Sequence, residues 1–520
     1  MTFTEWFIFF LAVQVISFLG SWKLYQKAGR KWWEAAIPVY NAVVLMKIIN
    51  RPLWWTILLF IPIVNLIMFP VVWVETIRSF GRNSTLETFL VIITCGFYIY
   101  YVNYFTDAKY IEDRSLHPRT AAGEWISSIL FAVIAATIVH TYLIQPFTIP
   151  TSSLEKTLLV GDFLFVSKFH YGARTPLTAV AFPMVHDTIP VLGVKSYLEE
   201  PQIPYFRLPG FQDIERSDIV VFNWPVDTMV NMYYTDKYYY KPIDKKTNYV
   251  KRAVGVPGDS LEIIDGKIHI NSQPLELPDR AKPQYSYTGT TNGQGFDPRY
   301  LYERYNITDS YGYNPANNTF VIQSLTEEAY NKFKNHPNVA SIERVNSEKG
   351  AGAADVFPME KDLQWNRDNF GPIYIPKEGE TIPLTSESLP MYKRIIEVYE
   401  GSEMGINNKL SQNGTQILLN GFPADSYTFK QDYYWMMGDN RHNSLDSRYF
   451  GYVPETHVVG KPVFIWMSWD ANGTGFFDKI RWDRMFTTVG GDGNPISYLP
   501  YFLIILVMIF AFSFFKKRRD

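Results

Sequence analysis

Five stretches of the chain contain no Asp, Glu, Lys or Arg, and each is about long enough to cross the roughly 30 Å hydrocarbon core of a bilayer. A backbone in lipid must satisfy its own hydrogen bonds, so we expect all five to be membrane-spanning helices. The second stretch contains Pro62, Asn65 and Pro70, which favour a kinked or partly re-entrant segment. The five stretches are residues 6–22, 53–74, 88–106, 125–144 and 496–515.

Basic residues between these stretches predict their orientation, because cytoplasmic loops carry an excess of Lys and Arg. Loops 23–51 and 109–119 and the tail 516–519 are basic, whereas loop 75–87 has only Arg78 and Arg82. The pattern predicts an external N-terminus, four spans, a large external region and one return span. No basic residue precedes the first stretch, so we do not expect a cleavable signal peptide.

Composition excludes several classes of protein. The 520 residues include 49 Lys and Arg against 51 Asp and Glu, and this balance argues against a nucleic-acid binder. A single cysteine excludes an internal disulfide framework and a CxxC zinc site. No HExxH motif occurs either. We therefore expect no metal, no cofactor and no nucleic-acid partner.

The external region, residues 146–495, has the texture of a β domain. Asp265-Gly266 and Asn420-Gly421 are the residue pairs that hairpin turns of type I′ favour. A polar, loop-rich segment at about 271–409 predicts a large insertion in the β core. Short helices are expected at 326–334 and 455–459. Runs at 162–168, 218–222, 249–256 and 393–399 predict strands.

Three polar segments in this region can carry chemistry. In the first, Pro146 and Pro150 favour an extended backbone, and Thr151, Ser152 and Ser153 follow where the chain leaves the bilayer. The alternative is that Thr151 or Ser152 only caps a short helix.

The second segment places Lys251 inside an apolar strand, where alternation points it away from the face of Val250 and Arg252. The alternative is a lysine on an exposed face. The third is the run 438–448, Gly-Asp-Asn-Arg-His-Asn-Ser-Leu-Asp-Ser-Arg. We expect its ions to form a structural network that pairs Asp439, Asp446, Arg441 and Arg448.

Together these segments resemble the bacterial type I signal peptidases, membrane-bound serine–lysine proteases. The similar blocks follow the family order, and those at 251–259 and 438–454 are the most specific. The first three spans, residues 176–215 and much of 271–430 are outside the resemblance. The earlier blocks are 149–153, 161–163 and 216–222.

The resemblance implies a role for each matching residue. Ser153 is the expected nucleophile and Lys251 its general base. The hydroxyl of Thr151 and the backbone N–H of Ser153 are expected to form the oxyanion hole, and Ser444 to orient the lysine. The expected substrate-pocket residues are Phe147, Ile149, Leu154 and Val250.

The residue types suit this chemistry, because a serine hydroxyl needs a neighbouring base, and a lysine serves when burial lowers its pKa. The sequence also departs from the family pattern. Leu154 replaces the usual methionine, and Glu155-Lys156 replaces a segment that typically contains proline. Lys156 is a rival base, which we reject because a lysine in an exposed turn beside Glu155 keeps its ordinary pKa. His442 takes a variable position and is expected to be a loop residue.

The predicted protein is a signal peptidase I that cleaves translocated preproteins after small residues. Its expected partners are preprotein signal peptides, the lipid bilayer and the secretion translocon. We expect it in the bacterial inner membrane, multi-pass, with the catalytic domain outside the cytoplasm. The predicted regions are a three-span region 1–124, a fourth span 125–145, a mainly-β catalytic domain 146–495 with its insertion, a fifth span 496–515 and a basic tail 516–520.

Two other functions fit some features of this pattern. One is a catalytically silent relative that binds exported chains, which the presence of Ser153, Lys251, Thr151 and Ser444 disfavours. The other is a transporter with an external sensory domain, which the scarcity of ionisable residues within the spans disfavours.

Overall fold

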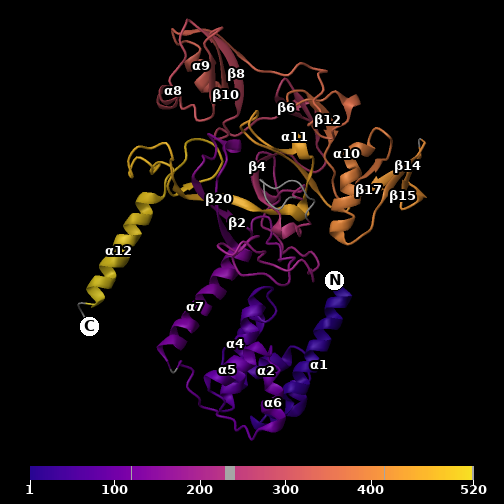
Figure 1. Cartoon of the computed structure of the whole chain (residues 1–520), viewed down its shortest axis with the longest axis vertical. Coiled ribbons are helices and arrows are strands. Elements are labelled where there is room, and N and C mark those ends of the chain that lie inside the picture. The colour runs from indigo at the N-terminus through magenta and orange to yellow at the C-terminus, as the bar shows by residue number, and fades with distance from the viewer. Residues whose placement is uncertain (119, 229–239, 415, 518–520) are drawn as a thin grey trace. The chain divides into compact units, whose positions relative to one another are not determined.

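A computed structural model describes residues 1–118, 120–228, 240–414 and 416–517 of the chain (Figure 1). Arg119, Arg518 and Arg519, which contribute to the predicted orientation, lie outside the described residues. The chain divides into two compact units. One consists of Met1–Leu143 and Arg174–Arg207, and the other of Ile144–Ala173 and Leu208–Asp520.

The first unit is helical. Its longest helix, α1, begins with a capping box in which Thr2 and Glu5 satisfy each other's free backbone N–H groups. A buried cluster that includes Leu24, Phe80 and Val102 joins α1, α4, α5 and α6. The helices are α1 (Phe3–Lys27), α2 (Tyr40–Ile48), α3 (Trp55–Leu58), α4 (Val64–Ser79), α5 (Thr85–Ile93), α6 (Tyr98–Phe105) and α7 (Ala121–Ile138), with the 3-10 helix η1 (Trp32–Ala35) and the π-helical turn η2 (Val139–Leu143).

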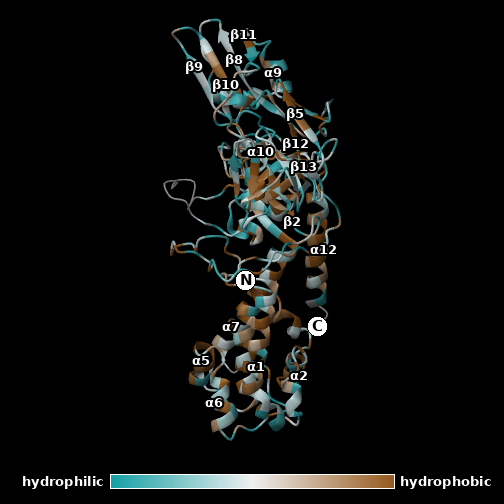
Figure 2. Cartoon of the chain, turned by 90° about the vertical axis from the view of Figure 1, so that its right-hand side faces the viewer, coloured by the Kyte–Doolittle hydropathy of each residue, from teal (hydrophilic) through white to brown (hydrophobic). Residues whose placement is uncertain are grey.

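Among the described residues, three helices are long and apolar enough to cross a membrane: Phe3–Lys27, Ala121–Leu143 and Leu499–Lys516. The hydrophobic colouring of α5 and α7 is visible in Figure 2. Helices α5 and α6 would add a fourth span if they form one broken segment, but they are bent by 118°. The stretch 53–74 does not form one continuous helix, and the interruption expected from its prolines is present. There α3 ends at Leu58 and α4 begins at Val64, because Pro62 interrupts the helix and Ile63 adopts a positive φ of 69°.

The second unit is built on an eight-stranded antiparallel sheet with the order β1-β2-β20-β3-β4-β18-β19, and β21 pairs with β20. This order brings the N-terminal strands β1 and β2 into one sheet with strands from the far end of the chain. The strands are β1 (Ile144–Thr148), β2 (Asp162–Ser167), β3 (Ile219–Asn223), β4 (Asn248–Gly255), β18 (Tyr433–Met437), β19 (Val453–Pro454), β20 (Val458–Ser468) and β21 (Thr487–Thr488).

The sequence between β4 and β18 forms smaller sheets. One has the order β11-β8-β10-β9, another β12-β5-β6-β7, a third pairs β13 with β17, and the last has the order β14-β15-β16. Their strands are β5 (Ser260–Ile264), β6 (Lys267–Ile270), β7 (Gln273–Pro274), β8 (Gln284–Thr291), β9 (Tyr311–Asn314), β10 (Thr319–Thr326), β11 (Val339–Arg344), β12 (Phe370–Tyr374), β13 (Thr381–Pro383), β14 (Leu410–Asn413), β15 (Gln416–Leu419), β16 (Phe422–Pro423) and β17 (Ser426–Thr428).

Short helices complete the second unit, and α12 ends it with a long apolar segment. The predicted short helix at 326–334 is confirmed as α9, and the one at 455–459 is a single 3-10 turn that leads into β20. The helices are α8 (Pro298–Tyr305), α9 (Glu327–Phe333), α10 (Leu389–Arg394), α11 (Ser447–Phe450) and α12 (Leu499–Lys517), with the 3-10 turns η3 (Ser152–Leu154), η4 (Ile243–Lys245), η5 (Lys361–Leu363), η7 (Ser402–Met404) and η8 (Glu455–His457) and the π-helical turn η6 (Ile395–Tyr399).

The predicted strands at 162–168, 218–222 and 249–256 are confirmed as β2, β3 and β4. Both predicted hairpins are also present, and the Asp-Gly and Asn-Gly pairs at their turns all have positive φ. The strand predicted at 393–399 is wrong, because this segment is helical in α10 and η6. Its buried residues Tyr392, Ile395, Ile396 and Tyr399 follow the i, i+3, i+4, i+7 spacing of a helix face.

Candidate active site

The first hydroxyl segment leaves the edge strand β1 and forms the short turn η3. Hydrogen bonds from Ile149 N to Asp162 O and from Gly161 N to Ile149 O, both 2.9 Å, extend the contact between this segment and β2. Thr151 precedes η3 with an extended backbone, and its side chain makes no capping hydrogen bond. The alternative that Thr151 serves only as a helix cap is therefore not supported, because its hydroxyl makes no capping hydrogen bond. Ser153 is buried, with 8% of its surface exposed.

Strand β4 brings Lys251 to this serine. Lys251 Nζ lies 2.8 Å from Ser153 Oγ and 3.1 Å from the carbonyl oxygen of Val250. The lysine is only 4% exposed, which excludes the alternative of a lysine on an open strand face. Strand β4 lies in the interior of the sheet, between β3 and β18. Its Lys251 contacts a serine that is 98 positions away in the sequence.

Burial lowers the pKa of Lys251 to about 8, whereas the negative charges of Asp446 and Asp439 act to raise it. A buried ammonium loses hydration that nothing fully replaces, so the neutral amine is favoured. Nζ also lies 5.1 Å from the centre of the Tyr249 ring. A lysine with this pKa has a substantial neutral fraction near pH 8 and can accept a proton from the adjacent hydroxyl.

Part of the ion-pair network expected within the polar run 438–448 is present. Arg448 holds Asp446 through contacts of 2.9 and 2.8 Å. Asp439, expected to pair within this run, is instead held by Arg252 from β4 at 2.8 and 2.6 Å. The register of β4 with β18 explains this choice, since Arg252 lies opposite Met437, two residues before Asp439.

Arg441 is buried, and its Nε makes no hydrogen bond within the residues that the structure describes. Its Nη1 lies 4.0 Å from the sulfur of Met437. Burial lowers the pKa of Arg441, while Tyr285 and Asp439 act to raise it. Its main-chain N–H donates to Gln284 O at 2.9 Å, so its backbone connects the loop to β8.

Ser444 lies close to the nucleophile segment. A side-chain Cβ at Gly438 would come within 2.3 Å of Ser444 Oγ and 2.5 Å of Ser153 O, so only glycine fits between them. The Ser444 hydroxyl is buried and has no hydrogen-bond partner among the described residues. Lys251 Nζ bonds Ser153 and Val250, and no hydrogen bond joins it to Ser444 among the described residues.

The four expected pocket residues belong to one apolar cluster. Ile149 and Leu154 are buried in it, and Phe147 and Val250 pack against it with some of their surface exposed. Phe147 comes from β1, and Val250 is the neighbour of Lys251 on β4. The cluster therefore adjoins both members of the serine–lysine pair.

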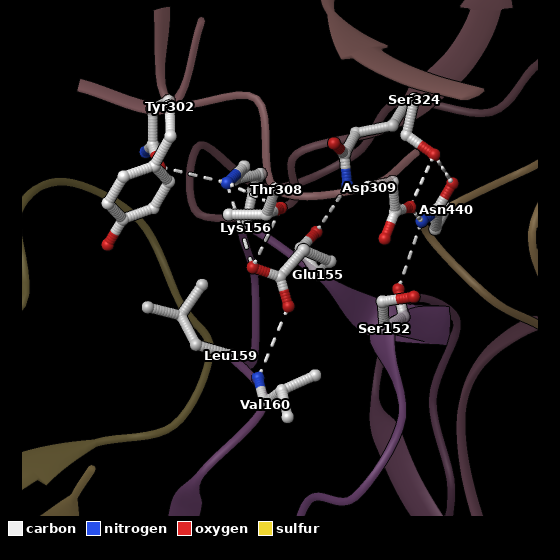
Figure 3. A network of polar contacts seen from close by, with 12 residues as sticks. Ser152, Glu155, Lys156, Leu159, Val160, Tyr302, Thr308, Asp309, Ser324 and Asn440 are labelled. Carbon is white, nitrogen blue, oxygen red and sulfur yellow. Dashed lines mark hydrogen bonds and ion pairs between the residues drawn. The ribbon is translucent and has the colours of Figure 1, made fainter. Parts of the chain in front are cut away.

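Lys156 is not in the exposed turn expected for it. It is partly buried, and burial lowers its pKa although Glu155 acts to raise it. Its Nζ donates to Asn306 Oδ1 at 3.0 Å and to Thr308 Oγ1 at 3.1 Å, and it lies 3.6 Å from Glu155 Oε1 (Figure 3). Exposure is therefore the wrong reason for rejecting Lys156 as a base. Its amine is engaged by the loop after α8 rather than by Ser153.

His442 is bonded through both ring nitrogens. Nε2 lies 2.7 Å from Asp368 Oδ1, and Nδ1 lies 3.1 Å from the backbone nitrogen of Ser286. Burial lowers the pKa of His442, while Asp368 acts to raise it. This places His442 as a loop residue that joins neighbouring segments. Over the described residues, no group of three or more His, Cys, Asp or Glu side chains is arranged to hold a metal ion.

Sequence reasoning missed the side chains that hold the nucleophile segment. Asn440 donates from its Nδ2 to Ser152 O at 3.1 Å, and Asn443 donates to Ser152 Oγ at 3.1 Å. Both amides also contact Asp309, whose position in a loop-rich segment gave no signal. The two asparagines lie in the polar run 438–448, where the density of polar residues was the only available indication.

Comparison with known proteins agrees with this geometry. A family model described as signal peptidase, peptidase S26, matches residues 122–328 and 384–469, together more than half of the chain. A second model, of a family of unknown function (DUF5684), matches residues 33–113. A buried serine–lysine pair is a known variant of the serine-protease arrangement.

Similar proteins include signal peptidase I of Buchnera aphidicola subsp. Acyrthosiphon pisum, 24% identical over 74% of this chain and 90% of that protein. Signal peptidase I of Haemophilus influenzae is 25% identical over 73% of this chain and 79% of its own length. Signal peptidase I of Rickettsia massiliae is 31% identical over 30% of this chain and 46% of its own length.

The chain belongs to the signal peptidase family, peptidase S26. Its activity is that of a serine endopeptidase that cleaves signal peptides. The three long apolar helices are compatible with a membrane-bound enzyme.

Proposed function

We propose that Ser153 is the nucleophile of this signal peptidase and Lys251 its general base. The observation that carries the proposal is the 2.8 Å separation of Ser153 Oγ and Lys251 Nζ at a site where both residues are buried. Burial lowers the pKa of the lysine to about 8, so its neutral form is available near physiological pH. This arrangement meets the requirement that the base lie within hydrogen-bond reach of the proton it removes.

The reaction then follows from these two groups. Lys251 takes the hydroxyl proton as Ser153 Oγ attacks the scissile carbonyl carbon. The ammonium returns the proton to the departing amine as the C–N bond breaks, which leaves an acyl-enzyme ester. Lys251 next removes a proton from water, whose oxygen attacks the ester carbon, and the proton returns to Ser153 Oγ.

We assign the oxyanion hole to the Thr151 hydroxyl and the Ser153 backbone N–H, as the family resemblance implies. Thr151 is exposed and its hydroxyl is not used as a helix cap, which leaves it free to donate to a substrate. Ser444 is proposed to orient Lys251 when the substrate is bound. Its buried hydroxyl has no hydrogen-bond partner among the described residues and lies close to the nucleophile segment.

Phe147, Ile149, Leu154 and Val250 are proposed to bind the residues before the cleavage point. An apolar cluster beside the nucleophile favours small side chains such as alanine, because a large one would have to displace packed residues. The proposed substrate is accordingly the end of a signal peptide, with small residues at its two pocket positions.

We also propose that the enzyme lies in the bacterial inner membrane as a multi-pass protein. The catalytic domain 146–495, with its insertion at about 271–409, would then face the outside, between a polytopic region that ends at residue 145 and a return span 496–515. Lipid and the secretion translocon are the proposed partners. Support comes from the basic loops in the sequence and from the apolar helices at both ends of the catalytic domain.

The direct test compares two neighbouring serines. Purified full-length protein in detergent should lose cleavage of a model preprotein when Ser153 is changed to Ala. Ser152→Ala is the matched control and should keep most activity, because the Ser152 hydroxyl contacts Asn443 rather than Lys251. Full activity of Ser153→Ala would overturn the assignment of the nucleophile.

A further inference from the structure

The residue before the proposed nucleophile is held by two asparagine side chains that share one carboxylate. We call Asp309, Asn440 and Asn443 the asparagine clasp. Asp309 Oδ2 accepts a hydrogen bond from Asn440 Nδ2 at 2.6 Å and from Asn443 Nδ2 at 3.1 Å. Each amide carries two hydrogens, and the contacts to Ser152 account for the second one in both cases. Asp309, Asn440 and Ser152 are labelled in Figure 3.

We propose that Asp309 is a positioning residue that aims the oxyanion-hole N–H of Ser153 through Asn440. The proposal rests on the assignment of Ser153 above. The peptide group between Ser152 and Ser153 is planar, so its C=O and N–H point in opposite directions in the trans form. Asn440 Nδ2 donates to the carbonyl oxygen of Ser152 at 3.1 Å. Fixing that oxygen therefore fixes the direction of the Ser153 N–H.

The main chain of Asn440 adds a second contact. Its N–H donates to the carbonyl oxygen of Ser153 at 3.1 Å. One residue thus holds the carbonyl groups on both sides of the Ser153 Cα, which restricts the rotation of the nucleophile as well as that of the N–H. Asn440 itself is fully buried, so water does not compete for these bonds.

The direction of the Asn440 amide depends on two acceptors, Asp309 Oδ2 and the Ser152 carbonyl oxygen. An amide can be flipped unless its partners distinguish oxygen from nitrogen. The Asp309 carboxylate and the Ser152 carbonyl oxygen can only accept, so both require the amide nitrogen. Ser324 Oγ, which is buried, lies 2.8 Å from Asn440 Oδ1 and 2.6 Å from Asp309 Oδ2, and it can donate its single proton to one of them. Loss of the Asp309 carboxylate would remove an acceptor from both asparagine amides at once.

The loop 306–309, which contains Asp309, also contacts the residues that follow Ser153 in the nucleophile turn. Lys156 Nζ donates to Asn306 and Thr308, and Thr308 Oγ1 lies 3.3 Å from Glu155 Oε1. Gln284 Nε2, at the start of β8, donates to the carbonyl oxygen of Glu155 at 2.9 Å. The polar contacts of loop 306–309 therefore flank the nucleophile turn, and Asp309 is the member that contacts the asparagines bonded to Ser152.

The experiment measures kcat and KM of the full-length enzyme in detergent for wild type, Asp309→Ala and Asp309→Asn. Asp297→Ala is the matched control. Asp297 lies in the same region of the chain, but within the part that the structure describes its side chain caps α8, accepting from the backbone N–H groups of Arg299 and Tyr300. A peptide boronate, which forms a tetrahedral adduct with the serine, reports on the oxyanion hole in the same variants.

For Asp309→Ala we expect kcat to fall by about 10-fold to 100-fold and KM to stay within about twofold of wild type. The fall in kcat should not exceed that caused by removing an oxyanion-hole donor outright. Boronate affinity should fall in proportion to kcat. The kcat and boronate affinity of Asp309→Asn should lie between those of wild type and of the alanine variant. Its amide oxygen can accept one of the two asparagine hydrogen bonds, but its NH₂ group cannot accept the other. Asp297→Ala should keep kcat and boronate affinity.

Three outcomes would overturn the proposal: kcat of Asp309→Ala within twofold of wild type, a change confined to KM, or a fall in kcat with unchanged boronate affinity. If the alanine variant does not fold, the same criteria are applied to Asp309→Asn. Failure of this proposal is separable from failure of the proposed dyad. If Ser153→Ala is inactive and Asp309→Ala is fully active, only the positioning role of Asp309 is contradicted. If Ser153→Ala is active, the assignment of Ser153 and Lys251 as nucleophile and base is contradicted.

Discussion

Arg252 and Asp439 form a buried ion pair with two contacts, Nε to Oδ1 at 2.8 Å and Nη2 to Oδ2 at 2.6 Å. Arg252 follows the proposed base Lys251 in β4, and Asp439 is one of the two carboxylates that act to raise the pKa of that lysine. The other, Asp446, is held by Arg448. Because each carboxylate has its own arginine, their effect on Lys251 is reduced and burial determines the direction of its pKa.

Removing this arginine should therefore affect both stability and the pH profile. In Arg252→Met, the carboxylate of Asp439 stays buried without its partner, which typically destabilises a protein by about 3–5 kcal/mol. The uncompensated charge should also raise the pKa of Lys251 and move the acid limb of kcat/KM to higher pH. Thermal unfolding and a pH–rate profile on the folded fraction measure the two effects.

The control is Arg299→Met, because the Arg299–Glu303 pair is 2.8 Å long but exposed on both sides. Such surface pairs contribute about 0–1 kcal/mol. An Arg252 variant whose melting temperature and acid limb both match those of the Arg299 variant would contradict the role given to the buried pair.

The pH dependence of cleavage should report the ionisation of Lys251. Its pKa of about 8 predicts that kcat/KM rises with pH up to about pH 8 and then levels off, since only the neutral amine accepts a proton. Lys251→Arg should be inactive, because a guanidinium stays protonated. Lys156→Ala should leave the acid limb in place, as Lys156 contacts Asn306 and Thr308. Loss of activity in Lys156→Ala with activity retained in Lys251→Ala would mean that the other lysine is the base.

Lys251 should also reduce the stability of the fold at neutral pH. Its pKa is about 8 in the folded protein against an ordinary 10.5, so the unfolded chain binds more protons between these values. Stability therefore rises with pH across this window, and the unfavourable contribution is complete below about pH 8. Lys251→Met should be more stable at pH 7, by up to roughly 3 kcal/mol, and should lose this component of the pH dependence. Melting curves of the inactive Lys251→Met and Ser153→Ala variants at pH 7 and pH 10 test the difference.

Thr151 offers a narrower test of the oxyanion hole. Thr151→Val removes the hydroxyl while keeping the β-branched shape, and should lower kcat by roughly 10²–10³-fold if the hydroxyl donates to the oxyanion. Thr151→Ser keeps the donor and should retain most activity. Equal rates in the valine and serine variants would show that this hydroxyl is not a donor in the reaction.

Local patterns in the sequence were sufficient to predict many of the strands and hairpins of the second unit. Asp265-Gly266 and Asn420-Gly421 predicted their hairpins correctly, because type I′ turns need positive φ at both residues. The segment 393–399 was misjudged because its β-branched and aromatic residues suggest a strand, whereas the helical spacing becomes clear only when Tyr392 is included. The strand propensity of these residues therefore decided less than the helical spacing of the residues that become buried.

The polar contacts of the site were less predictable, because they depend on strand register. Asp439 was expected to pair within its own loop, but the pairing of β4 with β18 brings Arg252 to it from 187 residues away. Asp309 reaches Asn440 across 131 residues from a segment without a readable pattern. Sequence reasoning identified which residue types the chemistry needs, and the sheet order determined which of them meet.

The orientation of the enzyme in the membrane leads to a last prediction. The chain has one cysteine, Cys95, so Cys95→Ser gives a background without thiols. On this background, Asn292→Cys reports on the catalytic domain and Ser115→Cys on the basic loop 109–119, and both positions are exposed. If the basic loops face the cytoplasm, an impermeant maleimide should label residue 292 in intact spheroplasts and residue 115 only after lysis. Labelling of residue 115 but not of residue 292 before lysis would reverse the orientation, and a catalytic domain on the cytoplasmic side could not reach translocated preproteins.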